Sequence, residues 1–379
     1  MTSEQRKDAR YLRRKQKRKE KRESFARYDD YEWVFSYEHL YLSYKRCRQN
    51  VTWKASTQRF ITFAPTRIYK LYQTLMKNKY KSKGFFEFDI IERGKKRHIR
   101  SVRIDERVVQ RCLCDYCLVP LLSRTFIYDN GASLKNKGYH FARKRAIRAL
   151  KRHIATHGVE GYVLVSDFSK FFDNISHKVC KEILRKNVND PRIISLVEHF
   201  IDMFGDVGLG LGSQVSQIFA LASANRLDHY IKERLRIHGY VRYMDDCILI
   251  HRSKAYLEKC LKEIKAICER DSIVLNLRKT MIVKLSHGFT WIKTKFNVLS
   301  SGRILRRLTR KTIVIMRRKM KKLKRFLDDG RMQIFDVYMS FQSWRSYAMR
   351  FDAHRTITNL ETLFYETYGV TFKESSLIH

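Results

Sequence analysis

The sequence predicts an α+β fold in which helices surround a small antiparallel sheet. Residues 161–167 form an apolar run rich in β-branched residues that ends in an acid, as expected of a central buried strand. Residues 239–250 form two β-prone runs separated by a pair of aspartates, which predicts a tight hairpin with acids at its tip. Helical, strongly basic stretches lie towards both ends of the chain.

The charge of the chain indicates a polyanionic partner. The 379 residues include 79 Lys and Arg against 38 Asp and Glu, a formal net charge of +41, and the length allows a sizeable core with several subdomains. This excess exceeds what solubility requires. Aromatic residues make up 13% of the chain. Cations with aromatic residues suit nucleic acid, because phosphates attract the cations and exposed bases stack on rings.

Several other classes of protein are disfavoured. The sequence has no apolar run of 18 residues and no signal-peptide pattern, so we expect neither a membrane span nor secretion. Cys112, Cys114 and Cys117 lack a second Cys/His group with zinc spacing, and we interpret them as small buried residues of a helix that ends at Pro120. Unpaired thiols indicate a reducing, cytoplasmic location.

The regions outside the predicted sheet also have recognisable patterns. Residues 5–22 form a basic arm that alone would be disordered or a frayed helix, and that we expect to become ordered on RNA or DNA. Residues 85–104 predict a hairpin that turns at Gly94 and carries cations on its second strand. Residues 303–325 predict a basic helical stretch, and residues 335–368 predict a pair of amphipathic helices.

Three acids carry the chemical prediction. Asp167 follows the first strand, and Asp245 and Asp246 occupy the hairpin tip. Carboxylates held together repel one another, so a cation is the usual reason to gather them, although a solvated Asp-Asp turn is the alternative. Mg²⁺ prefers oxygen ligands and completes its shell with water and substrate phosphates. Two such ions can activate a 3′-hydroxyl and stabilise a leaving pyrophosphate.

The motifs around these acids resemble those of reverse transcriptases. Asp-Phe-Ser-Lys-Phe-Phe at 167–172 and Tyr-Met-Asp-Asp at 243–246 look like the two catalytic motifs of that family, and further similar blocks follow in order over roughly 85–296. The resemblance implies a right-hand polymerase fold, with an antiparallel sheet in the palm. Its expected parts are a basic arm at 1–25, an N-terminal helical region and fingers at 26–160, a palm at 161–300 and a basic helical thumb at 301–379.

The resemblance also implies roles for individual residues. The three aspartates would be catalytic and would bind two Mg²⁺ ions, with Mn²⁺ as a substitute, and Phe168 would join them at the metal. Lys279 would donate a proton to pyrophosphate. Phe172 would exclude a 2′-hydroxyl by filling its volume, and residues 289–292 would form the primer grip. The full set of nucleotide-binding residues implied is Lys95, Arg97, Phe168, Phe172, Leu211, Gln217 and Tyr243.

One block departs from the usual pattern of the family. In residues 208–220, Leu211 replaces the family's glutamine and Gln217 replaces its proline. This variant resembles the reverse transcriptases of diversity-generating retroelements, and is also similar to bacterial and phage "unknown group" enzymes, many of which act in antiphage defence. A glutamine can hydrogen-bond the nucleotide or template, whereas a leucine offers only an apolar surface, so we expect low fidelity.

The expected function is therefore an RNA-directed DNA polymerase, a nucleotidyltransferase. It would copy a structured non-coding RNA into cDNA from dNTPs, and whether it requires an accessory protein is left open. An untemplated or protein-primed DNA polymerase on the same palm is the alternative within the enzyme class. A non-catalytic RNA-binding scaffold is disfavoured, because an inactive palm has no need to retain three mutually repelling acids. The RNA copied, the priming mode and the oligomeric state are left open.

Overall fold

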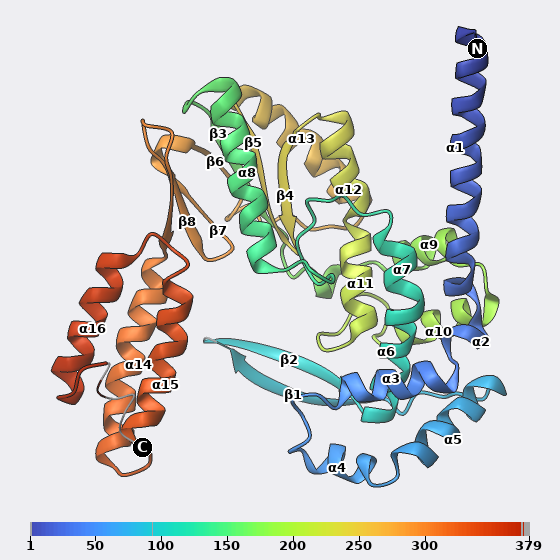
Figure 1. Ribbon diagram of the computed structural model, residues 1–379, viewed down its shortest axis with the longest axis horizontal. Helices are drawn as coiled ribbons and strands as arrows, with labels where there is room; N and C mark the ends of the chain where they lie inside the picture. Colours follow the sequence, from blue (N-terminus) through green and yellow to red (C-terminus); the bar gives the residue numbers. More distant parts are fainter. Residues whose placement is uncertain (1, 93, 373, 375–379) are drawn as a thin grey trace. The chain divides into compact units, whose positions relative to one another are not determined.

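A computed structural model describes residues 2–92, 94–372 and 374 of the chain (Figure 1). Its helices and three antiparallel sheets confirm the predicted α+β class. The chain divides into two compact units, each assembled from three segments. Unit 1 comprises Met1–Gly138, Phe168–Arg236 and Lys262–Leu275, and unit 2 comprises Tyr139–Asp167, Ile237–Leu261 and Asn276–His379.

Unit 1 is mainly helical, and polar side chains cap several of its helices. The Asp30, Ser36, Ser176, Asp190 and Ser213 side chains each accept a hydrogen bond from a backbone N–H in the first turn of the helix that follows. Its helices are α1 (Ser3–Ala26), η1 (Arg27–Asp29), α2 (Tyr31–Val34), α3 (Tyr37–Cys47), α4 (Ala55–Ile61), α5 (Ala64–Met76), α6 (Ile104–Leu113), η2 (Cys114–Leu118), α7 (Val119–Ser123), η3 (Phe172–Asn174), α9 (His177–Asn187), α10 (Pro191–Asp202), α11 (Gln214–Ser223), α12 (Asn225–His229) and η4 (Tyr230–Arg234). Helix α13 (Lys254–Arg270) contributes residues to both units.

The basic arm is helical in the structure. Helix α1 begins with a capping box, in which the Thr2 side chain accepts from the Gln5 backbone N–H and the Gln5 side chain accepts from the Thr2 N–H. Figure 1 shows α1 as a long helix that extends away from α2. Nearly all of its described side chains are exposed, so the arm offers its cations to solvent along its length.

The predicted hairpin in unit 1 is confirmed. Strands β1 (Phe85–Glu92) and β2 (Lys95–Val102) pair antiparallel, and Gly94 in their turn has a φ of +78°, a left-handed conformation that glycine adopts without strain. Cross-strand ion pairs, such as that of Lys96 with Asp89 at 2.9 Å, link the two strands.

The helix that follows runs further than predicted. The expectation that it ends at Pro120 is wrong, because α6 continues through the π-helical segment η2 into α7, which ends at Ser123. Pro120 lies in the first turn of α7, where the missing N–H of a proline is tolerated. Cys112, Cys114 and Cys117 are buried and free, as predicted.

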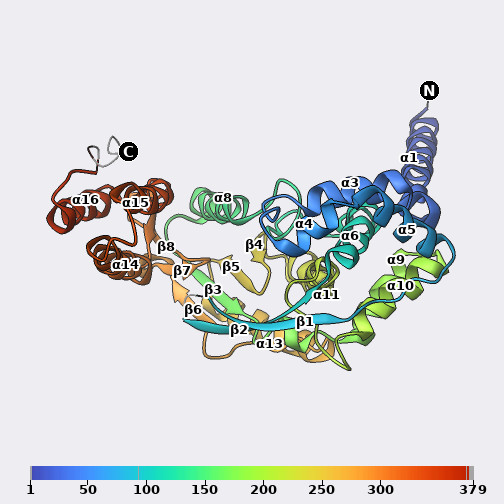
Figure 2. The ribbon, with the colours of Figure 1, turned by 90° about the horizontal axis from the view of Figure 1, so that it is seen from below.

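Unit 2 contains a four-stranded antiparallel sheet in the order β4-β5-β3-β6. Its strands are β3 (Tyr162–Asp167), β4 (Gly239–Tyr243), β5 (Asp246–His251) and β6 (Met281–Lys284). Strand β3 is an inner strand, as predicted, paired with β5 on one side and β6 on the other. Helix α8 (Tyr139–His157) packs against this sheet through Ala142, Ala146 and Leu150 (Figure 2). The hydrophobic core of unit 2 therefore includes Val163 of β3, the strand that ends in Asp167.

A second sheet and a helical group complete unit 2. The sheet has the order β7 (Phe289–Trp291), β8 (Thr294–Val298) and β9 (Ile304–Leu308), preceded by η5 (Leu285–His287). The helices α14 (Arg310–Asp328), α15 (Ile334–Ala348) and α16 (His354–Tyr368) pack around Met316, Met320, Phe341, Leu360 and Phe364 (Figures 1 and 2). The predicted helix pair at 335–368 is thus confirmed.

The start of the predicted basic helix at 303–325 is wrong. Residues 304–308 form β9 instead, since the turn at 299–303 returns the chain onto the edge of β8, where Leu305 and Leu308 become buried. In the described residues, no helix is both long and apolar enough to span a membrane.

Candidate active site

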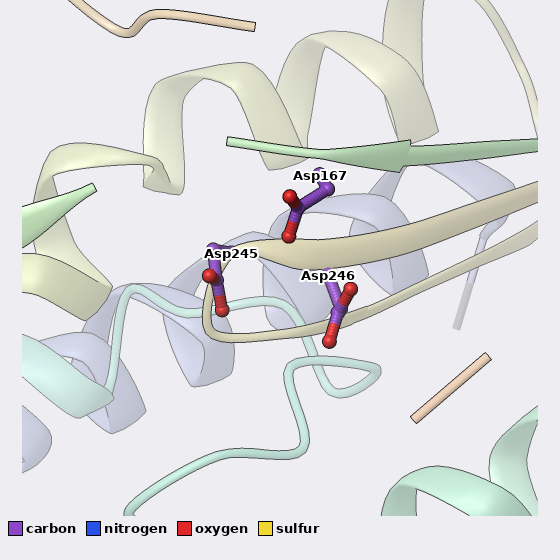
Figure 3. Close-up of side chains that lie close together, drawn as sticks. All are labelled: Asp167, Asp245 and Asp246. Carbon is purple, nitrogen blue, oxygen red and sulfur yellow. The ribbon is translucent and has the colours of Figure 1, made fainter. Parts of the chain in front are cut away.

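The three predicted aspartates converge within unit 2 (Figure 3). Asp167 is the last residue of β3 and is the register partner of Asp246, the first residue of β5. Asp245 lies in the turn between β4 and β5. One carboxylate oxygen from each of the three side chains lies within 4.8 Å of the other two. Antiparallel pairing therefore brings together acids that are far apart in sequence.

Burial and mutual repulsion make the charged forms of these carboxylates unfavourable. The Asp167 side chain is 9% exposed, and burial together with the nearby Asp245 and Asp167 carboxylates raises the pKa of Asp246 to about 7. The pKa of the Tyr243 hydroxyl is also raised, mainly because the hydroxyl is buried and to a lesser extent because the Asp245 and Asp246 carboxylates are close. A site of this kind is most stable when positive charge reaches it.

Two side chains from the segment that directly precedes β6 contact Asp167. The Lys279 ammonium lies 2.5 Å from Asp167 Oδ2, and Asn276 Nδ2 donates a hydrogen bond to the same oxygen at 3.1 Å. The Asn276 backbone N–H also donates to the Asp167 carbonyl at 2.8 Å. The hydrogen bond from Lys279 to Asp167 raises the pKa of Lys279. Lys279 was predicted, whereas Asn276 was not, because its signal in the sequence is only its place three residues before Lys279.

The turn that carries Asp245 has an unusual backbone. Met244 has a φ of +55°, a left-handed conformation that L-residues other than glycine adopt at a cost. Arg242, whose side chain is fully buried, donates from Nη1 to the Met244 carbonyl at 2.9 Å. Sequence reasoning missed Arg242. The signal available was a charged residue in an otherwise apolar strand, which is rarely buried without a partner.

The carboxylate cluster fits divalent metal ions. It offers hard oxygen ligands on a rigid sheet edge, and Lys279 already supplies a positive charge to Asp167. Among the described residues, this is the one group of three or more acidic, His or Cys side chains with metal-binding spacing. Phe168 was expected at the metal, but its side chain is buried against Phe171, so only its backbone could contribute.

Two of the predicted nucleotide-binding residues, Phe172 and Leu211, belong to segments that contact each other in unit 1. The Leu209 N–H donates to the Phe172 carbonyl at 2.7 Å, which fixes the loop containing Leu211 beside Phe172. A Cβ built on Gly212 would lie 3.3 Å from the carbonyl oxygen of Arg100, so this loop also touches β2. Phe172 and Leu211 are both half-buried.

The other predicted nucleotide-binding residues belong to β2, α11 and β4. Arg97 is exposed on β2, and Lys95 begins that strand. Gln217 is exposed on α11. Tyr243, in unit 2, is half-buried, with its ring edge-on to Tyr139.

Comparison with known proteins identifies the family. A family model described as "Reverse transcriptase (RNA-dependent DNA polymerase)" matches residues 54–301. The chain belongs to the reverse transcriptase family. The fold is accordingly the predicted right-hand polymerase fold, and the family is one of nucleotidyltransferases.

One bacterial protein is similar to this reverse transcriptase. Protein YkfC of Escherichia coli (strain K12) is 24% identical over 247 residues, which cover 52% of this chain and 62% of YkfC. The chain thus spans less than two thirds of the length of that relative.

Telomerase structures show a more distant likeness to this reverse transcriptase. The truncated apo telomerase of Candida tropicalis is 15% identical with a TM-score of 0.45, over 59% of this chain and 54% of that one. The telomerase of Candida albicans in complex with a fragment of telomeric RNA is 10% identical with a TM-score of 0.48, over 80% of this chain and 62% of that one.

Residues 289–292 belong to an apolar hairpin, and their role as a primer grip stays a prediction. Strands β7 and β8 pair through Phe289↔Phe296, and Phe289, Trp291 and Ile292 are buried. Ile292 and Lys293 form its turn, both with positive φ. The hairpin is thus fixed to the rest of unit 2 by its apolar side chains.

Proposed function

We propose that this reverse transcriptase is an RNA-directed DNA polymerase that synthesises cDNA by two-metal nucleotidyl transfer. The observation that carries the proposal is the convergence of Asp167, Asp245 and Asp246 within a chain segment that matches the family. Two Mg²⁺ ions, with Mn²⁺ as a substitute, are the metals that such oxygen ligands select. When bound, they supply activation of the primer 3′-hydroxyl and neutralisation of the leaving pyrophosphate.

The protein groups hold and orient the reactants. Asp167 and Asp246 face each other across paired strands, and Asp245 is presented by the turn at Met244. Lys279 occupies Asp167 Oδ2 in this state, so it must release that oxygen before the carboxylate can bind metal fully. Once released, its ammonium is free to donate a proton to the leaving pyrophosphate.

Selection of the nucleotide is assigned to residues of unit 1. Arg97 and Lys95 on β2 would contact the triphosphate. Phe172 would fill the volume of a 2′-hydroxyl and so favour deoxynucleotides. Leu211, beside Phe172, would give the nascent pair an apolar contact in place of a hydrogen bond, which lowers the penalty for mispairing. The proposed enzyme is therefore of low fidelity.

We assign the basic arm to residues 1–25, the N-terminal helical region and fingers to 26–160, the palm to 161–300 and the thumb to 301–379. In α14, Met316, Met320 and Leu323 are buried, whereas a set of cations is exposed for a phosphate backbone: Arg317, Arg318, Lys319, Lys321, Lys322 and Arg325. Helix α1 would contact the template RNA. The template would be a structured non-coding RNA, and an accessory protein would be a further partner. The biological role would lie in a diversity-generating retroelement or in antiphage defence.

A copying experiment tests this function against the untemplated alternative. The protein is incubated with Mg²⁺, four dNTPs and a DNA primer on a heteropolymeric RNA, and the products are sequenced. Extension products complementary to the RNA support the proposal. Products whose sequence ignores the RNA, or that form equally without it, would favour untemplated synthesis. RNA binding without any product would favour a scaffold.

A further inference from the structure

A cavity of about 880 Å³ lies in unit 1, bordered by helices α4 and α5, the β1–β2 hairpin and the start of α6. It shares no residue with the aspartate cluster. Its volume is typical of ligand pockets, which measure about 300–1,000 Å³. A space of this size accommodates a few unpaired nucleotides.

The wall of this cavity is strongly basic. Nine Lys and Arg residues line it, against two carboxylates, Asp105 and Glu106. Both carboxylates are already engaged. Asp105 pairs with Lys83 at 2.5 Å, and Glu106, which is buried, accepts from the Ser82 hydroxyl at 2.5 Å and the Lys83 N–H at 3.2 Å. Neither is therefore available to neutralise the remaining cations.

Three of the lining cations are well placed to meet phosphates. Arg59, Lys70 and Lys79 are exposed, and within the described part of the chain no carboxylate pairs with them. Gathering like charges around one cavity is unfavourable by itself. A polyanion that enters the cavity would relieve that repulsion and release its counterions.

An exposed aromatic ring accompanies the cations. Phe86 lines the cavity and is 54% exposed, so its ring is accessible to a ligand. The Arg103 guanidinium lies 5.3 Å from the centroid of this ring and helps to orient it. An exposed ring beside cations is the combination that binds single-stranded nucleic acid, whose unpaired bases can stack. Bases in a duplex are already stacked and could not use it.

We propose that this cavity binds a single-stranded segment of the RNA, with phosphates on Arg59, Lys70 and Lys79 and a base stacked on Phe86. Only the identity of the ligand as RNA rests on the proposed function. The cavity would hold unpaired RNA at a place independent of the metal-binding carboxylates.

Fluorescence anisotropy with a labelled oligouridylate of about 12 nucleotides, without dNTPs, tests this site. For a single strand, each phosphate that the protein neutralises contributes about 0.7 to the magnitude of the slope of log K against log salt concentration. The triple variant Arg59→Gln/Lys70→Gln/Lys79→Gln should therefore lower that magnitude by about 2. Phe86→Leu removes the ring but keeps an apolar side chain on β1. It should weaken binding about tenfold and leave the slope unchanged.

A matched control separates the cavity from net charge. Lys178→Gln/Lys186→Gln/Arg234→Gln removes one arginine and two lysines that are exposed elsewhere in unit 1, and it should keep the wild-type slope. If both triple variants lose the same slope, or if the cavity variant weakens an RNA duplex as much as the single strand, the proposal is wrong. Circular dichroism of each variant confirms that the comparison is between folded proteins.

The outcome is separable from that of the proposed function. If cDNA is made but the cavity variants bind like the control, the cavity proposal alone fails. If no cDNA is made but the cavity variants lose single-strand binding, the polymerase proposal fails and the binding site stands. An oligodeoxyuridylate of the same length provides the last arm: tighter binding of DNA than of RNA would contradict the assignment of the ligand.

Discussion

At the scale of single residues, Arg242 is the least expected contributor to the site. It is buried on β4 and donates to the carbonyl of Met244, the residue whose left-handed backbone presents Asp245. A left-handed conformation costs a residue such as methionine about 1–2 kcal/mol. We infer that Arg242 is a positioning residue, which holds the turn in a conformation that Met244 would otherwise leave.

The prediction for Arg242 includes a rescue. Arg242→Lys shortens the donor and should weaken Mn²⁺ binding about tenfold, the effect of losing about 1.4 kcal/mol from a hydrogen bond to a charged donor. Met244→Gly in the same protein should restore most of that affinity, because glycine adopts positive φ freely. Mn²⁺ titrations followed by electron paramagnetic resonance measure both. If Met244→Gly improves Mn²⁺ binding by the same factor in the wild-type background as in the Arg242→Lys background, then Arg242 does not act by holding the Met244 backbone.

Asp246 predicts a pH dependence. Its pKa is about 7 in the folded protein and about 4 in an unfolded chain, so the folded state holds the extra proton between these values. Without metal, stability from this group is present at low pH and is lost as pH rises toward about 7. Mg²⁺ should therefore raise Tm more at pH 8 than at pH 6. Asp246→Asn should remove that difference, and a Mg²⁺ effect independent of pH in the wild type would contradict it.

The apolar side chain of Leu211 is expected to set the rate of misincorporation during cDNA synthesis. Leu211→Gln returns a hydrogen-bonding side chain to the loop beside Phe172, and should lower misincorporation about tenfold, the effect of about 1.4 kcal/mol of discrimination. Sequencing of products from one RNA template measures this. Leu211→Met, which stays apolar and of similar volume, serves as the control. An unchanged error rate in Leu211→Gln would remove Leu211 from the account of fidelity.

At the scale of elements, α1 has a sided charge distribution. At about 100° per residue, six of the seven cations between Arg6 and Lys17 fall within about one third of the helix circumference, and Glu4, Asp8 and Lys15 lie outside that arc. The six are Arg6, Lys7, Arg10, Arg13, Arg14 and Lys17. A helix face of this kind suits the phosphates of an RNA stem more than a disordered arm does.

Exchanging charges around α1 tests that face at constant composition. Glu4→Arg/Arg6→Glu/Asp8→Arg/Arg10→Asp keeps the net charge but places two acids within the cationic arc. The slope of log K against log salt for an RNA stem should fall by about 2, given a change of about 0.9 per phosphate contact. Unchanged binding would mean that only the total charge of the arm matters.

Elements were predicted well where local pattern and tertiary contact agree. The strand ending at Asp167, the acidic hairpin and the turn at Gly94 follow from alternation and turn chemistry. The predictions that failed depended on context. Pro120 did not end its helical run, because a π-helical segment precedes it, and residues 304–308 became a strand because β8 offers an edge.

At the scale of the whole molecule, the sequence predicts which acids act but not what surrounds them. Asp167, Asp245 and Asp246 could be found because each follows or joins a β run. Asn276 and Arg242 could not, since their roles arise from hydrogen bonds that depend on the folded backbone. The cavity at Phe86 could not be predicted either, because it brings together helices and strands that are separate in sequence.

The most direct test of the central claim compares the wild type with Asp245→Asn/Asp246→Asn on an RNA template and DNA primer. We predict Mg²⁺-dependent extension by the wild type. In the variant we predict a loss of activity of at least about a thousandfold together with weakened Mn²⁺ binding, since bound metal ions stabilise the transferred charge by several kcal/mol. Asp206→Asn, an exposed acid in unit 1, should change neither. Equal extension, or equal inactivity with equal Mn²⁺ binding, in the wild type and the double variant would contradict the account.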